Sequence, residues 1–320
     1  MNPESLSSWA GRTCVLTGAT SGIGHVATER LAQMGVHVVG TGRDLKSCRE
    51  AETRILQSLA RSNGVQGSVK FLAGDYADPA SVRDLGLAIL DQCPRIDLLI
   101  HNVGAMFGRP ETAWSSPEDL GVEKTFAVNQ LAPFLLQRIL EAHFSEESSA
   151  EQEMLEGRPR RILVVASEGH RGLEPIRDWA EAVDGVSLSS DTYGKLGWPE
   201  YQRSKLANLL FARSLNRRYA GASVCVQALH PGVVGTGFAR KAGLPLWRRL
   251  WVKSRSISVS DGAEYVLAPL TGAEDTFYWS DGKPESPSDA AQDEASADDL
   301  WRFCMEKTES WVSAQEPRTA

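Results

Sequence analysis

The sequence predicts an α/β fold, in which a doubly wound parallel sheet of the Rossmann type carries helices on both faces. Three observations support this prediction. From Thr13 onward, short β-branched runs alternate with amphipathic helical stretches. The first of these runs leads directly into a glycine-rich turn. The runs are also largely apolar, which is typical of strands that are buried on both faces.

The expected strands are short apolar runs bounded by Gly, Asp, Pro or Ser. They cover residues 13–17, 36–40, 69–73, 96–102, 161–167 and 223–230. Helices are expected in the gaps between them. The clearest helix covers residues 204–219, where Leu206, Leu209 and Leu210 recur near helical spacing and arginines are available for the wet side.

The end of the chain is expected to be polar and partly helical. The acidic, small-residue stretch 280–299 is predicted to be a solvated connection to a last helix that starts near Asp299, because acidic side chains suit a helix N-terminus. The polar segment 146–157 is predicted to be a surface loop or a helix end. We see no internal repeat and no earlier linker. Residues 1–320 are therefore expected to form a single domain with a C-terminal helical tail over about 280–320.

Charge and cysteine content exclude several classes of protein. The net charge of −7 argues against a nucleic-acid partner, which needs clustered Lys and Arg. The five cysteines are an odd number without a C-x-x-C pair, so neither a disulfide framework nor a metal site is expected. The first residues lack an apolar signal region, and no stretch approaches 18 uninterrupted apolar residues. We therefore expect a soluble, cytoplasmic protein.

The first glycine turn indicates a nucleotide site. Gly18, Gly22 and Gly24 stand between a predicted strand and a predicted helix. Glycines let the backbone turn sharply and let a pyrophosphate approach the helix N-terminus, whose N–H groups and dipole favour an anion. The alternative is a tight turn without a ligand, but the position at the start of the domain favours nucleotide binding.

Arg43 favours NADP over NAD. It follows the second predicted strand and Gly42, where Rossmann proteins meet the adenosine ribose. An arginine with no acid at the strand end suits a 2′-phosphate. Asp44 can be interpreted in favour of either cofactor. A surface arginine at a helix start is the alternative for Arg43.

Tyr201 and Lys205 form a pair four residues apart on a predicted helix, so their side chains share a face. An ammonium near a phenol favours the ionised phenol, so Lys205 could lower the pKa of Tyr201. A single pair of this kind also arises by chance. Its meaning depends on the residues that accompany it.

Taken together, these motifs resemble the short-chain dehydrogenase/reductase family over nearly the whole chain. The stretch 17–24 is similar to the family's cofactor motif, and "HNVGAM" at 101–106 stands where the family has Asn-Asn-Ala-Gly. "SEGHRG", "YQRSKLANLLF" and "LHPG" most resemble the branch of retinol dehydrogenases and WW-domain oxidoreductases, although no WW domain precedes the glycine turn. His101 departs from the pattern and is interpreted as a structural substitution. His170 either lines the pocket or lies on an exposed loop.

The resemblance implies an NADP(H)-dependent oxidoreductase with four catalytic residues. Tyr201 donates the proton, Lys205 holds the nicotinamide ribose and tunes Tyr201, Ser167 orients the substrate oxygen, and Asn129 holds a water that relays protons. The implied cofactor contacts are Gly18, Thr20, Ser21, Gly22, Ile23, Gly24, Arg43, Asp75, Asn102, Gly104, Asn129, Tyr201, Lys205, Pro231, Gly232, Val233, Val234 and Thr236.

The substrate is expected to be a small lipophilic carbonyl compound or alcohol. The predicted substrate lid at 237–258 mixes Leu and Trp with basic residues, which suits a lipophilic ketone or aldehyde or peripheral contact with a membrane. A helix packed on the core is the alternative. A homodimer is compatible with the resemblance. Two other functions stay open: a cofactor-retaining epimerase or dehydratase on the same fold, and a non-catalytic dinucleotide-binding interaction protein.

Overall fold

A computed structural model describes residues 9–62, 66–115, 121–144, 159–184, 197–234, 256–272 and 275–313. Its centre is an eight-stranded sheet in the order β10-β9-β8-β7-β4-β1-β2-β3, and every neighbouring pair is parallel except β10 with β9. The strands are β1 (Thr13–Leu16), β2 (His37–Gly42), β3 (Val69–Ala73), β4 (Leu98–His101), β7 (Arg160–Val165), β8 (Val224–His230), β9 (Tyr278–Ser280) and β10 (Lys283–Pro284). A separate pair, β5 (Thr112–Ala113) and β6 (Val122–Glu123), is antiparallel.

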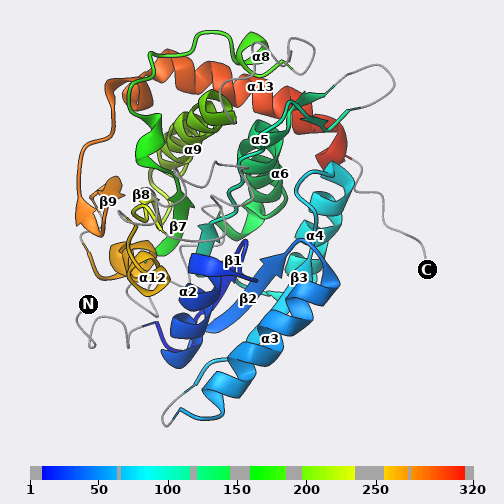
Figure 1. Cartoon of the computed structure of the whole chain (residues 1–320), viewed down its shortest axis with the longest axis vertical. Helices are drawn as coiled ribbons and strands as arrows, with labels where there is room; N and C mark the ends of the chain where they lie inside the picture. The colour runs from blue at the N-terminus through cyan, green and yellow to red at the C-terminus, as the bar shows by residue number, and fades with distance from the viewer. Residues whose placement is uncertain are drawn as a thin grey trace.

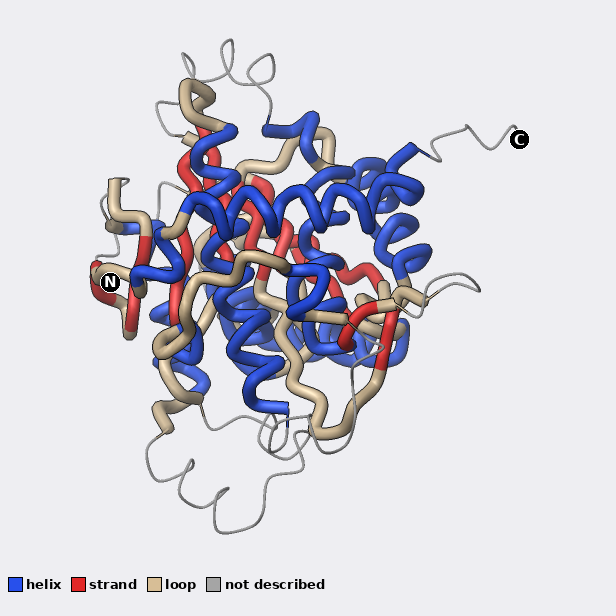
Figure 2. Tube along the Cα trace, turned by 90° about the horizontal axis from the view of Figure 1, so that it is seen from above, coloured by secondary structure: helices blue, strands red, loops and turns tan. Residues whose placement is uncertain are grey.

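Helices cover both faces of the sheet, and each face buries its own apolar core (Figures 1 and 2). One face carries α2 (Gly22–Gln33), α3 (Leu45–Leu59) and α12 (Val259–Leu267). The other carries α4 (Pro79–Gln92), α5 (Lys124–Phe126), the π-helix η1 (Ala127–Leu131), α6 (Ala132–Ile139), α9 (Trp198–Arg218) and α13 (Glu294–Ser313). Shorter helical segments are η2 (Glu141–Phe144), η3 (Glu168–His170), α8 (Trp179–Ala182), η5 (Ala268–Thr271) and η6 (Asp289–Gln292).

The predicted α/β doubly wound parallel sheet is confirmed. The six predicted strands are present, with ends that differ by at most two residues. The predicted helix at 204–219 is part of α9, which begins earlier, at Trp198. Gly197 precedes it in the left-handed region and Pro199 occupies the first turn, where its missing N–H costs nothing.

The expectation of a solvated connection over 280–299 holds for its first part, where most residues from Asp281 to Asp289 are exposed, but not for the rest. This segment contains β10 and η6, buries Ala290 and Ala291, and enters α13 at Glu294 rather than near Asp299. Its acidic residues bind specific partners. Asp293 accepts a hydrogen bond from the Ser296 N–H and pairs with Arg177, and Asp299 accepts from the N–H of Trp179 at the start of α8.

The long helix α13 closes one side of the molecule. It lies against α9 and α6, and Figure 1 shows it crossing both in orange and red. None of the helices in the described part of the chain is long and apolar enough to cross a membrane. The predicted surface segment 146–157 lies outside the described residues, as does the predicted lid except for its last residues, Ser256 to Ser258.

Candidate active site

The predicted site residues follow the carboxyl ends of four strands. Gly18 follows β1, Asn102 follows β4, Ser167 follows β7 and Pro231 follows β8. These strands are neighbours in the sheet, in the order β8-β7-β4-β1. The chain order reverses between β4 and β1. The edge outside such a reversal is where ligands bind in open α/β sheets.

The glycine turn after β1 is held by its own close packing and by β4. Gly18 and Gly22 have φ values of +69° and +58°, which favour glycine. A Cβ atom on Gly24 would lie 2.3 Å from the carbonyl oxygen of Gly18. The side-chain amide of Asn102 donates to the carbonyl oxygens of Thr17 at 2.8 Å and Gly18 at 3.3 Å. Asn102 therefore fixes the backbone of this turn.

The N-terminus of α2 fits the pyrophosphate of a dinucleotide. The Asp44 side chain caps α3 and the Asp78 side chain caps α4, but Ser21 makes no side-chain cap to α2, whose first turn contains no acidic residue. Ser21 is exposed, and Thr20, Gly22 and Ile23 are partly exposed. The first N–H groups of α2 and its dipole are thus available to an anion.

Arg43 lies at the end of β2 with its side chain 76% exposed. Asp44 is the N-cap of α3, because its carboxylate accepts from the N–H of Ser47 at 2.8 Å. This hydrogen bond is also the main reason that the pKa of Asp44 is lowered. Gly42 lies close to the glycine turn, since a Cβ atom there would meet Thr20 Cγ2 at 2.2 Å. Arg43 Nε also lies 4.0 Å from Oδ2 of Asp44, so the exposed guanidinium is adjacent to the turn and weakly paired with this carboxylate.

The turn after β8 lies close to the start of α2, across α12. Val234 and Ile23 both pack against Gly262 of α12, so the two predicted cofactor segments come together there. Gly232 has a φ of +79°, and Val233 is 51% exposed. Buried Nδ1 of His230, just before this turn, has no hydrogen-bond partner in the described part of the chain. Pro231 and Gly232 are buried, so the exposed Val233 is the part of this turn that a nicotinamide could contact.

The remaining predicted cofactor residues differ in how they lie. Asp75 is partly exposed after β3, and one of its carboxylate oxygens accepts from the N–H of Ala77 at 3.0 Å. Gly104 is exposed, and a Cβ atom on it would lie 3.3 Å from Nζ of Lys205. Gly104 therefore faces the lysine across the edge of the sheet. Thr236 lies outside the described residues.

Helix α9 brings Tyr201 and Lys205 onto one face, with Nζ of Lys205 5.7 Å from the centre of the phenol ring. The hydroxyl of Ser167 accepts a hydrogen bond from the N–H of Gly169 at 3.2 Å. Burial raises the pKa of Tyr201 to about 12, and a hydrogen bond with Ser167 opposes this rise. The phenol is therefore a protonated acid at neutral pH, in hydrogen-bond contact with Ser167.

In the chain without cofactor, burial outweighs any lowering of the Tyr201 pKa. The lowering expected from Lys205 together with the oxidised nicotinamide stays a prediction for the cofactor complex. Lys205 is 3% exposed, and burial lowers its own pKa to about 7. Its Nζ donates to the carbonyl oxygen of Val165 at 3.1 Å and to Oδ1 of Asn208 at 3.0 Å. A partly neutral amine bound to other groups cannot offset the desolvation of the phenol.

Asn129 lies in η1, a single π-helical turn of the kind often found at functional sites. Its side chain is occupied by protein: Oδ1 accepts from the N–H of Ala105 at 2.7 Å, and Nδ2 donates to the carbonyl oxygen of Ala105 and to Oγ of Ser204, both at 2.9 Å. Asn129 therefore ties α9 to the segment after β4. Its backbone carbonyl accepts from the side chain of Asn208 at 2.7 Å.

Two histidines near the site are structural. Nε2 of His101 lies 3.1 Å from Oε1 of Gln137, and burial lowers the pKa of His101 to about 4, as expected of a core residue. His170 is fully buried, so the exposed-loop interpretation is wrong. Its Nδ1 lies 2.7 Å from the carbonyl oxygen of Ser167, and its Nε2 accepts from the N–H of Ser288 at 3.1 Å.

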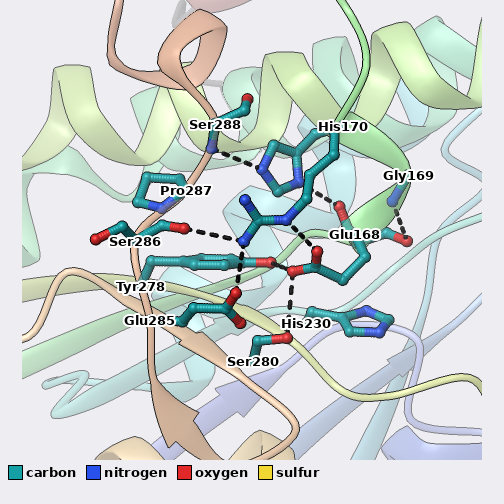
Figure 3. Close-up of polar contacts among 12 residues, drawn as sticks. Glu168, Gly169, His170, His230, Tyr278, Ser280, Glu285, Ser286, Pro287 and Ser288 are labelled. Atoms are coloured by element: carbon teal, nitrogen blue, oxygen red, sulfur yellow. Dashed lines mark hydrogen bonds and ion pairs between the residues drawn. The ribbon is translucent and has the colours of Figure 1, made fainter.

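Ser167 is followed by a polar network that the sequence reasoning missed, drawn in Figure 3. Glu168 accepts hydrogen bonds from the hydroxyls of Tyr278 at 2.6 Å and Ser280 at 3.2 Å. It also pairs with Arg171, which donates to Glu285 at 3.0 Å. We call these five residues the Glu168 network. It connects the turn after Ser167 to β9 and to the segment before η6. The quoted run "SEGHRG" contains the signal, but its partners are more than 100 residues away.

Trp198 and Asn208, both on α9, were also missed as candidate site residues. The indole of Trp198 is 46% exposed, and its ring centre lies 5.6 Å from that of Tyr201. Asn208 is buried and contacts Lys205 one turn earlier. The spacing of three residues on either side of the Tyr201–Lys205 pair could have identified both, since such residues share a helix face.

Comparison with known proteins supports the family resemblance seen in the sequence. Residues 12–168 match the family model described as short chain dehydrogenase. The chain is 33% identical over 311 residues to retinol dehydrogenase 14 of Mus musculus, which covers 91% of this chain and 84% of that protein. It is 32% identical over 223 residues to the WW domain-containing oxidoreductase of Gallus gallus, covering 70% of this chain and 49% of the relative.

Solved structures agree on the fold. A crystal structure of a protein from Mycobacterium paratuberculosis is 26% identical with a TM-score of 0.64, and the match covers 97% of each chain. The NADP complex of Pseudomonas aeruginosa RhlG is 22% identical with a TM-score of 0.63, covering 87% of this chain and 96% of that one. The family model, the sequence relatives and the glycine turn lead to one conclusion: the chain belongs to the short-chain dehydrogenase/reductase family and is an NAD(P)-binding oxidoreductase.

Proposed function

We propose that the chain is an NADP(H)-dependent oxidoreductase that interconverts a lipophilic ketone or aldehyde and its alcohol. One observation carries the proposal. The Tyr201 phenol, held as a protonated acid in contact with Ser167, lies beside Lys205 at the sheet edge that also bears the uncapped N-terminus of α2. A proton donor next to a nucleotide-binding turn is the arrangement that carbonyl reduction requires.

The bound cofactor supplies or accepts the hydride. On the protein side, the N–H groups at the start of α2 bind the pyrophosphate, and Asn102 keeps the glycine turn in shape. Lys205 donates to the nicotinamide ribose. The turn at Pro231 and Gly232, with His230 before it and Val233 and Val234 after it, binds the nicotinamide end. Asp75 and Gly104 lie along the adenosine side. Thr236 belongs to the same proposed set.

The proton is delivered by Tyr201. As the carbonyl oxygen gains charge it needs a proton, and the Tyr201 hydroxyl donates it. Ser167 accepts a hydrogen bond from the Gly169 N–H, so its own proton is directed towards the oxygen of the substrate or of Tyr201. A lowered pKa lets Lys205 exchange a proton near neutral pH. Asn129 holds α9 at the correct distance from the segment after β4.

Arg43 supports the choice of NADP. Its guanidinium is exposed at the end of β2, and the neighbouring Asp44, which lies 4.0 Å away, uses its carboxylate mainly as the cap of α3. A guanidinium can bind a 2′-phosphate with charge-assisted hydrogen bonds, whereas an acid at the strand end is needed to accept from a free 2′-hydroxyl.

Trp198 supports a lipophilic substrate. Its indole is 46% exposed and offers apolar surface that a substrate could cover. Trp198 packs beside Tyr201 and reaches Gly169, where a Cβ atom would lie 3.6 Å from the indole. An apolar wall therefore adjoins the proposed proton donor. The relatives named retinol dehydrogenase point to the same class of compound.

The wider organisation stays a prediction. We propose one NADP-binding domain over residues 1–320, with the substrate lid at about 237–258 and the C-terminal tail packed against it. We also propose a cytoplasmic location, with the lid as the part that would contact a membrane, and a homodimer as the assembly to test. Size-exclusion chromatography with light scattering measures the last point directly.

The test is a panel of carbonyl compounds with NADPH and with NADH. Consumption of reduced cofactor in step with formation of alcohol supports the proposal, and Tyr201→Phe is the matched control for background reduction. Turnover without net cofactor consumption would instead indicate an epimerase or dehydratase. No turnover with any ketone or aldehyde of the panel, despite NADPH binding, would contradict the proposed reaction.

A further inference from the structure

We propose that Asn208 is a positioning residue for Lys205, and that its side-chain amide is the direct protein link between the lysine and the backbone carbonyl of Asn129. The inference deepens the proposed function and rests on it for its kinetic part. The water that Asn129 is expected to hold for a proton relay from Lys205 stays a separate prediction.

Every polar atom of the Asn208 side chain is used in this link. Oδ1 accepts from Nζ of Lys205 at 3.0 Å. Nδ2 donates to the carbonyl oxygen of Asn129 at 2.7 Å and to Oε1 of Gln130 at 3.1 Å. Lys205 and Asn208 lie one turn apart on α9, while Asn129 and Gln130 belong to η1. Asn208 thus joins the two helices at the level of the lysine.

The orientation of the amide follows from its partners. If the oxygen and nitrogen of Asn208 were exchanged, the NH2 group would face the lysine amine, and the oxygen would face two acceptors, the Asn129 carbonyl and Gln130 Oε1. The two contacts of the exchanged oxygen would lack a donor, and the contact with Lys205 would lack an acceptor whenever the lysine is charged. Asn208 is 2% exposed, Asn129 and Gln130 are fully buried, and unsatisfied groups at such positions are costly. The amide therefore presents its oxygen to Lys205 alone.

Few other groups can hold the lysine. Its other acceptor is the carbonyl oxygen of Val165 at the end of β7. The titratable groups that face Lys205 are Tyr201 on its own helix and His230 at the end of β8, and neither carries a negative charge at neutral pH. The acids nearest to the site have other partners: Glu168 on η3 binds Tyr278, and Asp281 lies 4.0 Å from His230. The lysine is thus placed by two neutral oxygens.

The chemical consequence differs between two substitutions of Asn208. Asn208→Leu removes the oxygen and leaves Lys205 with the Val165 carbonyl alone. Asn208→Asp puts a carboxylate beside the amine, which favours its charged form. Asn216 provides a matched control, since it lies on the same helix and is exposed. Asn216→Asp adds the same charge to α9 away from the lysine.

The experiment combines steady-state kinetics with a direct titration of Lys205 by NMR in protein with isotope-labelled lysine, assigned with Lys205→Met. We expect Asn208→Leu to lower kcat about 10-fold to 100-fold, as a displaced reacting group does, with the KM for the carbonyl substrate changed by less than about threefold. We expect Asn208→Asp to raise the pKa of Lys205 by about one unit or more and to move the pH profile of kcat in the same direction. Asn216→Asp should do neither.

The two readouts separate failure of this inference from failure of the proposed function. Equal Lys205 titration in wild type and Asn208→Asp overturns the inference whether or not the enzyme reduces carbonyls. A wild-type enzyme without carbonyl turnover overturns the proposed function, and the titration then decides the role of Asn208. If Asn208→Leu does not fold, Asn208→Ser provides the kinetic arm with a smaller side chain. Unchanged kcat in a folded variant at position 208 also overturns the inference.

Discussion

Tyr201 and Lys205 share one face of α9 with the lysine nitrogen 5.7 Å from the centre of the phenol ring, but the chain holds them in opposite states. Burial raises the pKa of the phenol to about 12 and lowers that of the amine to about 7. At neutral pH the phenol keeps its proton and the amine exchanges one. These opposite states agree with the proposed reaction, in which Tyr201 donates a proton and Lys205 takes part in replacing it.

Tyr201→Phe removes the proton donor and keeps the ring. We expect turnover to fall by about 10²–10⁴, the usual contribution of a positioned general acid. Folding and NADPH affinity should persist, because the packing of the ring against Trp198 is retained. Steady-state kinetics with a carbonyl substrate and a fluorescence titration with NADPH measure both effects. Near-wild-type turnover would assign the acid to another residue.

Lys205→Met should change the pH dependence of stability. Below pH 7 the lysine is charged in both folded and unfolded chains, so the cost of burying it is greatest there. As pH rises from about 7 to its ordinary value of 10.5, the folded chain releases the proton first and this cost disappears. Between about pH 6 and pH 10, the unfolding free energy of wild type should therefore rise relative to Lys205→Met by about 2–4 kcal/mol.

Urea unfolding of both proteins across this pH range measures the difference. Parallel curves would mean that Lys205 is not neutralised by burial. The same variant should lose both turnover and cofactor affinity, because the proposed ribose contact is removed with the charge. Lys307→Met is the control: it removes a lysine from α13, away from the site, and should change neither the pH dependence of stability nor turnover.

Arg43→Ala should reduce the preference for NADPH over NADH. Charge-assisted hydrogen bonds to a 2′-phosphate contribute about 1.5–3 kcal/mol, so the dissociation constant of NADPH should rise about 10-fold to 100-fold while that of NADH changes little. Calorimetric titration with both cofactors measures this. Arg49→Ala, on the neighbouring helix α3, is a matched control. Equal affinity of wild type for the two cofactors would refute the assignment of NADP.

Trp198→Ala should act on the substrate rather than on the chemistry. Losing an apolar wall raises the KM for bulky lipophilic ketones by about 10-fold or more, since an aromatic side chain contributes about 1.5–3 kcal/mol when covered. Small aliphatic ketones should be almost unaffected, and Trp198→Phe should restore most of the difference. An equal loss for small and bulky substrates would show that Trp198 supports Tyr201 instead of binding the substrate.

Much of the fold was predictable because its signals are local. The apolar runs that become β1, β3 and β8 are continuous and bounded by turn residues, so periodicity locates them. The glycine spacing at 18–24 likewise has a local meaning, a turn that only small residues can make. The order Ser167, Tyr201, Lys205 was predictable by resemblance, and the structure brings these residues together at one edge of the sheet.

The parts that could not be predicted depend on distant partners or on solvation. The two-residue strand β10 and the three-residue strand β9 carry too little pattern to stand out from a polar segment. The sequence predicts that the acidic residues after Ser280 are solvated. In the structure, Asp293 forms an ion pair with Arg177, and Asp299 accepts a hydrogen bond at the start of α8. The effect of burial on the pKa of Tyr201 could not be predicted, because spacing gives the distance to Lys205 and says nothing of burial.

Because of the Glu168 network, the turn after Ser167 can reach its final structure only late in synthesis of the chain. The nucleotide-binding half, through β4, is complete early in translation, but the turn that carries Ser167 is secured by Tyr278, Glu285 and the backbone of Ser288. A ribosome must therefore make about nine-tenths of the chain before these contacts can form. A nonsense mutation just ahead of Tyr278 would remove the partners of the turn after Ser167 together with β9 and α13.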